Sequence, residues 1–320
     1  MFIAIDEVGN EIEAIYATRS KKYYCPVCQS EVIVKRGDFK IAHFSHQNIN
    51  MCERYLYRRE SPLHLKLKND LYVMLKPHYD VRLEYYLHEI EQIPDCLVEY
   101  SVALEIQLSK ISPSLILERT NGYKKLGIDV RWIHDDSTIV TKADTIFLNH
   151  FQISTMNEFH LFTVNSDTQT FFAYRVKGNV GGMRWLYEKE MISHHDLVRP
   201  INDIDEFIQM ETDFISNEIK RARMMRSVRN KTLTYLYLLQ VSADELPVFF
   251  RYLTPFERYI QESPLEWKLY LYYHIKNKSF NYHAFLDYIT IRKINTNLTS
   301  RDIANGLLYD FKSLLRISNE

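Results

Sequence analysis

Two carboxylates and an amide in the segment 93–109, "IPDCLVEYSVALEIQLS", have types and spacing that could do chemistry. The segment alternates like a pair of strands, yet Asp95, Glu105 and Gln107 occupy positions where a buried strand favours apolar residues. A hairpin turn centred on Tyr100 would place Asp95 opposite Glu105. Gln107 would share the face of Glu105, because side chains two residues apart in a strand point the same way.

Two facing carboxylates repel each other, so one must take up a proton or both must share a cation. Oxygen donors suit Mg²⁺ or Mn²⁺, ions that keep several water molecules for a phosphate substrate. A metal-bound water could then attack phosphorus. We therefore expect Asp95 and Glu105 to hold Mg²⁺ or Mn²⁺, with Gln107 beside them. The alternative is that all three are solvent-facing hairpin residues.

A second group of polar residues lies on a predicted helix. The apolar period becomes helical at Ser61, which can cap the helix, and Pro62 suits its first position. The apolar stripe consists of Leu63, Leu67, Leu71 and Met74, before Pro77. Glu60, His64 and Lys68 recur every four residues and would lie on about one face, looking into a cleft. The alternative for these three residues is a solvated polar face.

Cysteine and histidine pairs near the start of the chain have the spacing of a zinc site. Cys25 and Cys28 are followed, after fourteen residues, by His43 and His46. Two such pairs separated by a hairpin can place four ligands tetrahedrally around Zn²⁺ and stabilise a segment too small for its own core. Cys52 could replace one histidine. The alternative is two incidental cysteines and surface histidines in a β-hairpin.

Composition limits the remaining function classes. The 320 residues include 40 basic and 41 acidic side chains, for a net charge of -1, which argues against a histone-like protein but permits a local basic groove. No Gly-x-Ser-x-Gly elbow and no glycine-rich phosphate loop occur, so a serine hydrolase and ATP use are not expected. With no export signal and no apolar run long enough for a membrane span, we expect a cytoplasmic protein with reduced thiols.

The order of elements predicts three regions. Residues 1–57 contain short strands and turns around the cysteines, residues 58–180 alternate helix and strand, and residues 181–320 become helical after Gly181-Gly182. We also expect a helix near 110–121, ended by Asn121-Gly122, and a conspicuously basic helix over 217–231 that could contact DNA or remain solvated.

Several of these motifs together resemble a known family. Pro94-Asp95, followed after nine residues by Glu105-Ile106-Gln107, resembles the PD-(D/E)xK nuclease core. With the cysteine-histidine segment before it and "ESPLH" between, residues 1–135 resemble the competence protein CoiA family. The resemblance implies an α/β (α+β) fold with a restriction-endonuclease-like core, a small zinc-ribbon-like β segment before it and a helical C-terminal domain after it.

The resemblance also implies a function. It suggests a cytosolic nuclease that processes incoming single-stranded or branched DNA in bacterial natural transformation. Asp95 and Glu105 would match the metal-binding acids, while Gln107 stands where many relatives carry lysine, a charge that Lys68 could supply. Glu60 could bind a second ion, and His64 could contact phosphate.

Two alternatives belong to other classes. The first is a non-catalytic DNA-binding accessory protein with an inactive nuclease fold. The second is a helical module that recruits recombination proteins.

Overall fold

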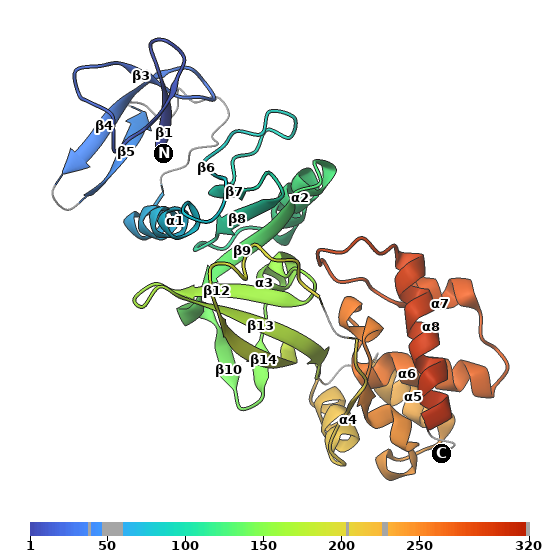
Figure 1. Ribbon diagram of the computed structural model, residues 1–320. Coiled ribbons are helices and arrows are strands. Elements are labelled where there is room, and N and C mark those ends of the chain that lie inside the picture. Colours follow the sequence, from blue (N-terminus) through green and yellow to red (C-terminus); the bar gives the residue numbers. More distant parts are fainter. Residues whose placement is uncertain (38–39, 47–59, 203–204, 226–229, 318–320) are drawn as a thin grey trace.

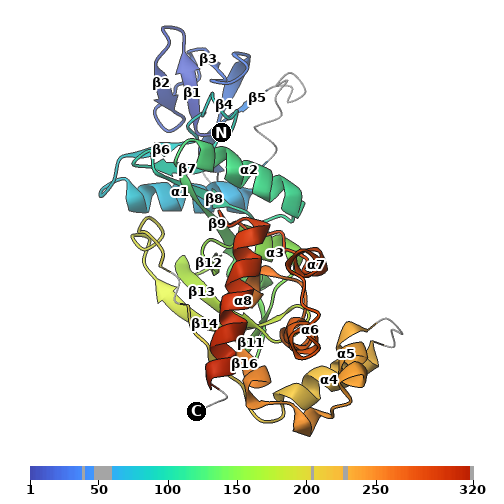
Figure 2. The same cartoon turned by 90° about the vertical axis from the view of Figure 1, so that its right-hand side faces the viewer.

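The computed structural model describes residues 1–37, 40–46, 60–202, 205–225 and 230–317. The chain forms three regions in sequence order: an N-terminal set of strands, a central α/β domain and a C-terminal group of helices (Figure 1). Both views place the N-terminal strands at one end of the molecule, while the C-terminal helices lie alongside and beyond the central domain (Figure 2). This arrangement confirms the mixed α/β fold expected from the sequence.

The N-terminal region is a five-stranded antiparallel sheet in the order β2-β1-β3-β4-β5. Its strands are β1 (Ile3–Asp6), β2 (Glu11–Glu13), β3 (Tyr23–Tyr24), β4 (Glu31–Gly37) and β5 (Lys40–His46). Gly9, with a φ of +91°, forms the first turn, as its place before Asn10 predicts. A small core around Tyr23 and Phe44 holds the sheet together, and Cys25 is buried in it.

The central domain is built on a nine-stranded mixed sheet in the order β10-β11-β14-β13-β12-β9-β8-β7-β6. Its strands are β6 (Val81–Leu83), β7 (Cys96–Val98), β8 (Val102–Ile106), β9 (Asp129–Asp135), β10 (Val140–Lys142), β11 (Thr145–Phe147), β12 (His160–Asn165), β13 (Thr170–Asn179) and β14 (Arg184–Ile192). Strand β9 pairs in parallel with β8 and β12, whereas the other neighbours are antiparallel.

Helices cover the two faces of this sheet near β7 and β8. Helix α1 (Pro62–Leu75) packs Leu71 into the same core as Leu104, while α2 (Pro113–Lys125) packs Tyr123 into a second core with Ala103. Because successive strand residues point to opposite faces, α1 and α2 lie on opposite sides of β8. A third helix, α3 (His150–Thr155), follows β11.

The limits of α1 and α2 follow from their end residues. As predicted, the Ser61 side chain accepts a hydrogen bond from the His64 backbone, and Pro62 opens α1. The predicted end of the second helix at Asn121-Gly122 is wrong, because α2 continues to Lys125. The left-handed residue that follows α2 is Gly127, with a φ of +71°.

The β7–β8 hairpin has the register expected from the sequence. Cys96 pairs with Leu104 and Val98 with Val102, so Tyr100 lies at the centre of the turn. Tyr100 and the residue before it both have a φ of 50°, the left-handed conformation in which asparagine and glycine are usual. The turn therefore forms without its usual residues, and it brings the backbone of Asp95 beside that of β8.

The expected boundary at residue 180 does not coincide with the end of the sheet. Strands β13 and β14 form an antiparallel hairpin, and Gly181 and Gly182, with φ values of +98° and +62°, make its turn. The two glycines therefore continue the sheet rather than separate domains, and the expectation of helix directly after them is wrong. Leu197, beyond β14, is still buried in the core that contains α1.

The C-terminal region is largely helical. Its helices are α4 (Phe214–Met224), α5 (Lys231–Leu239), α6 (Pro264–Lys276), α7 (Tyr282–Tyr288) and α8 (Ser300–Ile317), with 3-10 turns η3 (Ala243–Glu245), η4 (Val248–Arg251) and η5 (Phe256–Tyr259). A two-stranded sheet joins β15 (Ile208–Gln209) to β16 (Tyr252–Leu253). The expected basic helix over 217–231 is divided, because α4 ends at Met224 and Asn230 caps α5; residues 226–229 lie outside the described part. Among the described residues, the helices are too short or too polar to span a membrane.

Packing of α8 depends on one close approach. A Cβ atom on Gly306 would lie 2.1 Å from a ring carbon of Phe256, so α8 touches η5 where only a hydrogen fits. Alanine at position 306 should therefore lower the free energy of unfolding by about 1–3 kcal/mol, although alanine favours helix by about 1 kcal/mol over glycine. Urea unfolding measures this difference. The control is exposed Lys312→Ala on α8; a Gly306→Ala protein more stable than its parent would contradict this packing.

Candidate active site and metal centre

Asp95 is the centre of a buried polar cluster between α1 and the β7–β8 hairpin. One of its carboxylate oxygens accepts hydrogen bonds from His64 Nε2 at 2.9 Å and from the backbone N–H of Ile106 at 2.8 Å. The other oxygen lies 3.3 Å from Lys68 Nζ. Asp95 thus joins α1 to the hairpin, at the place where the sequence predicts a site.

Lys68 connects this carboxylate to two more. The side chain is almost completely buried, and its Nζ donates to Glu60 Oε1 at 2.5 Å and to Glu84 Oε1 at 2.6 Å. The four-residue spacing therefore does bring Glu60, His64 and Lys68 to one side of α1. The alternative of a solvated face does not hold for Lys68.

Glu84 is a member of the cluster that the sequence analysis missed. It follows β6, has a φ of 52°, and donates its backbone N–H to the carbonyl of Asp95 at 3.2 Å. Its carboxylate accepts from the backbone N–H of Phe2 and lies 3.8 Å from the amino nitrogen of Met1. The sequence feature that could have indicated Glu84 is its position as a lone acid in the largely apolar segment "VRLEYYL". One such residue does not show which side chains it contacts.

Charge pairing controls protonation in the cluster. Burial alone would lower the pKa of His64, but its hydrogen bond to Asp95 and the negative charges of Asp95 and Glu60 outweigh burial and raise it. Burial would raise the pKa of Asp95, but Lys68 and His64 hold it well below its usual range. Lys68 stays charged, because Glu84, Asp95 and Glu60 outweigh the effect of burial and raise its pKa. Asp95 is therefore ionised at neutral pH.

Glu105 and Gln107 point elsewhere. The Glu105 carboxylate accepts hydrogen bonds from Arg119 and Tyr123 of α2, and burial raises its pKa although Arg119 partly offsets this. Gln107 donates to the carbonyl of Ser109 at 2.5 Å. Asp95, at the open end of β7, bends towards α1, whereas Glu105 lies inside β8 and faces α2. The two acids are thus opposite in register but bind different helices.

The donor set of Glu60, His64 and Asp95 fits a divalent cation. One ligand atom from each lies within 4.8 Å of the others. Two carboxylates and one imidazole suit Mn²⁺ or a similar first-row ion better than Mg²⁺, which prefers oxygen alone. Carboxylates also outnumber Lys68 by three to one in this cluster. Glu60 and His64 have side chains 18% and 21% exposed, so they form the edge that solvent can reach.

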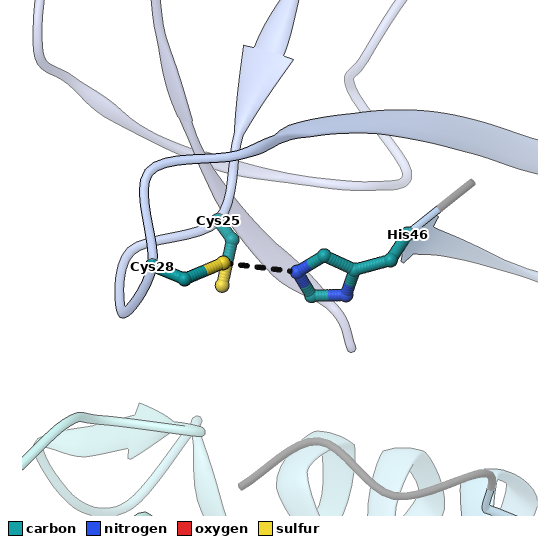
Figure 3. A group of neighbouring side chains, drawn as sticks. All are labelled: Cys25, Cys28 and His46. Atoms are coloured by element: carbon teal, nitrogen blue, oxygen red, sulfur yellow. Dashed lines mark hydrogen bonds between the residues drawn. The ribbon is translucent and has the colours of Figure 1, made fainter. Parts of the chain in front are cut away.

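A second ligand group lies in the N-terminal sheet (Figure 3). Cys25 and Cys28, on the loop between β3 and β4, direct their sulfur atoms towards the ring of His46 at the end of β5. Cys28 Sγ lies 3.3 Å from His46 Nε2, and the three ligand atoms lie within 4.8 Å of one another. Burial raises the pKa of the Cys25 thiol to about 12, an effect that a bound cation would reverse. The group could supply three of the four ligands of a zinc-ribbon site.

The prediction that His43 is the fourth ligand is not supported by the geometry. Two strand residues three apart point to opposite faces of β5, so His43 cannot accompany His46. His43 Nδ1 instead lies 2.9 Å from the carbonyl of Ile41. Cys52, the other predicted ligand, lies outside the described residues.

Comparisons with known proteins match the N-terminal region and the central domain separately. Residues 9–55 match the sequence model described as "Competence protein CoiA, N-terminal domain", and residues 60–197 match "Competence protein CoiA, nuclease-like domain". Competence protein CoiA of Bacillus subtilis (strain 168) is 34% identical over 143 residues, which are 43% of this chain and 37% of the relative. The match therefore spans little more than a third of that relative's length. No solved structure matches.

Replacing Lys68 should destabilise the protein far more than replacing Lys66. Lys68→Met leaves buried carboxylates without their counter-ion and should cost about 3–5 kcal/mol of unfolding free energy. Lys66→Met removes only an exposed pair with Asp70 on the same helix and should cost less than about 1 kcal/mol. The pKa of Asp95 is depressed in the folded state, so its stabilisation is lost as pH falls, and the Lys68→Met penalty should shrink in acid. Equal penalties for the two variants, measured by urea unfolding, would exclude this role.

Cobalt spectroscopy can test the ligands in the N-terminal sheet. Co²⁺ bound to thiolates gives a sulfur-to-metal charge-transfer band, which we expect in the parent protein. The band should weaken in Cys28→Ser, because one of the two thiolates is removed. His46→Gln should change the d–d spectrum, whereas His43→Gln should leave both features unchanged. An altered spectrum in His43→Gln would show that His43 is a ligand after all.

Proposed function

The chain belongs to the competence protein CoiA family, and on this premise we propose that its central domain is a metal-dependent nuclease that processes DNA during bacterial natural transformation. The observation that carries the proposal is the grouping of Glu60, His64 and Asp95 beside Lys68, inside the part of the chain that matches the nuclease-like domain. Residues of these types can bind a cation and transfer protons to or from a phosphodiester.

Each side chain has a distinct part in this proposal. Asp95 and Glu60 would hold Mn²⁺ or Mg²⁺, which when bound supplies an activated water and compensates charge on the phosphate. His64, at the exposed edge, would bind the ion through one neutral ring nitrogen and could donate the N–H of its other ring nitrogen to a phosphate oxygen. Glu105 would join the ligands only by leaving Arg119, since its carboxylate is now bound to α2.

In this mechanism Lys68 supplies the positive charge that many relatives obtain from a lysine at the position of Gln107. Gln107 cannot provide positive charge and is bound to Ser109, whereas Lys68 Nζ lies 3.3 Å from Asp95. A lysine on α1 can therefore place its charge beside Asp95. This interpretation explains why a buried ammonium group is kept within reach of Asp95.

The proposed substrate and partners are supported by surface charge on α4 and by the family. We propose DNA, single-stranded or branched, as the substrate, with recombination proteins as further partners. Exposed Lys220 and Arg223 on α4 could bind phosphates, and such contacts would weaken steeply with added salt. Zinc, bound by Cys25, Cys28 and His46, would stabilise the N-terminal sheet.

A non-catalytic DNA-binding protein is the second candidate. Specific contacts favour it: Arg119 and Tyr123 already bind Glu105, and Lys68 already bridges Glu60 and Glu84. A protein with these pairs in place could keep the nuclease fold and bind DNA without cutting it.

Cleavage of single-stranded, duplex and branched DNA by the full chain with Mn²⁺ would separate the two candidates. We expect Asp95→Asn to lower the rate at least about 100-fold, because it removes a metal-binding charge while keeping the side-chain shape. Asp80→Asn, an exposed acid near the same hairpin, is the matched control and should cut normally. Glu105→Gln shows whether Glu105 becomes a ligand.

The opposite result is equally informative. If the parent and both aspartate variants bind DNA with the same affinity and none of them cuts, the nuclease proposal fails. The accessory-protein candidate then takes its place.

A further inference from the structure

Three histidines meet at the end of α1 that is remote from Asp95. His78 follows the helix after Pro77, and His194 and His195 follow β14. Their ring centroids lie 4.1 Å, 4.7 Å and 5.9 Å apart, and one ring nitrogen from each lies within 4.8 Å of the other two. We propose that His78, His194 and His195 form a second transition-metal site, with Zn²⁺ as its natural occupant.

The chemistry of the donors favours this class of ion. Three neutral imidazoles suit Zn²⁺, Ni²⁺, Co²⁺ or Cu²⁺, whereas Mg²⁺ and Ca²⁺ require oxygen ligands. Three protein ligands also leave a fourth tetrahedral position for water or a small anion. This donor set differs from the thiolate-rich group in the N-terminal sheet and from the carboxylates around Asp95.

Tyr79 orients one of the three rings. Its hydroxyl group lies 3.0 Å from His195 Nδ1. When Nε2 of this ring binds a metal, Nδ1 carries the proton and donates it to the Tyr79 oxygen. Such an outer partner fixes the tautomer and the direction of a metal-binding histidine. The hydrogen bond thus leaves Nε2 of His195 for the ion.

His194 supplies independent support. Its Nε2 is buried from solvent and makes no hydrogen bond within the described part of the chain. Leaving a buried polar atom unsatisfied costs about 1–3 kcal/mol, so such atoms normally have a partner. A cation between the three rings would be that partner.

The neighbouring acid is already engaged and does not compete for the ion. Asp196 accepts hydrogen bonds from the backbone and hydroxyl of Ser193 at 2.9 Å and 2.6 Å and from Arg199 at 2.9 Å. These contacts shape the turn that presents His194 and His195. The site is therefore a histidine site with a preformed loop on one side and the end of α1 on the other.

A metal here would join parts of the central domain that are more than a hundred residues apart in sequence. The turn after β14 leads directly to Leu197, which shares a core with Leu75, the last residue of α1. Binding to the folded state alone stabilises that state. The ion would thus fix α1, which carries His64 and Lys68, against the last strand of the domain.

Metal content of the full chain tests the proposal. After loading with Zn²⁺ and gel filtration, the parent should retain one equivalent more than His194→Gln/His195→Gln. Tyr79→Phe should weaken binding by about 10–100-fold, the usual effect of losing an outer partner. His283→Gln, which changes an exposed histidine on α7, is the control and should keep every equivalent. Cys28→Ser should lose zinc from the N-terminal sheet and keep the histidine-bound ion.

A measurement on the parent protein avoids dependence on folded variants. Zn²⁺ should protect His78, His194 and His195 from diethyl pyrocarbonate, read residue by residue by mass spectrometry, while His283 reacts at the same rate with and without the ion. Equal zinc content in the parent and the double histidine variant, or no protection of the three histidines, would overturn the proposal.

Discussion

The buried ammonium group of Lys68 is the interaction on which the candidate site depends. It bridges Glu60 and Glu84 and lies beside Asp95, so it connects α1 with the ends of β6 and β7. Asp95 and Glu84 are buried and could not stay ionised without it, because an unpaired buried charge is strongly unfavourable. Glu84 extends the network to the N-terminal sheet through the backbone of Phe2. One lysine thus holds together three parts of the chain.

The ion pairs of Lys68 would impede the proposed catalysis. A cation that approaches Glu60 and Asp95 must share them with Lys68, and the phosphate that follows would be attracted by the same ammonium group. In the proposed mechanism the site would combine ligands for a metal with a fixed positive charge, a combination that suits phosphodiester cleavage. The same pairs would also stabilise an inactive domain, and the difference between the two candidates is whether a metal can enter beside Lys68.

Local signals in the sequence predict much of this structure. Ser61 and Pro62 define the start of α1, and the alternation around Tyr100 gives the β7–β8 register. The four-residue spacing of Glu60, His64 and Lys68 predicts their common side of the helix. In each case the determining interactions join residues close together in the sequence, so a short sequence pattern is enough to predict the structure.

Features that depend on distant contacts could not be predicted in this way. Glu84 joins the cluster through a lysine sixteen residues before it, and Glu105 turns away because Arg119 and Tyr123 of α2 bind it. His43 and His46 looked like a pair by spacing alone, but strand geometry separates them. Gly181-Gly182 suggested a domain boundary followed by helix, whereas these glycines make the turn between β13 and β14 and continue the sheet.

The most direct test of the central claim is anomalous diffraction from crystals of the full chain soaked in Mn²⁺. We predict a manganese peak between Glu60, His64 and Asp95, with Lys68 still within contact distance of Asp95. A map with no peak there, and Lys68 still bridging Glu60 and Glu84, would contradict the account and favour a DNA-binding protein without catalytic activity.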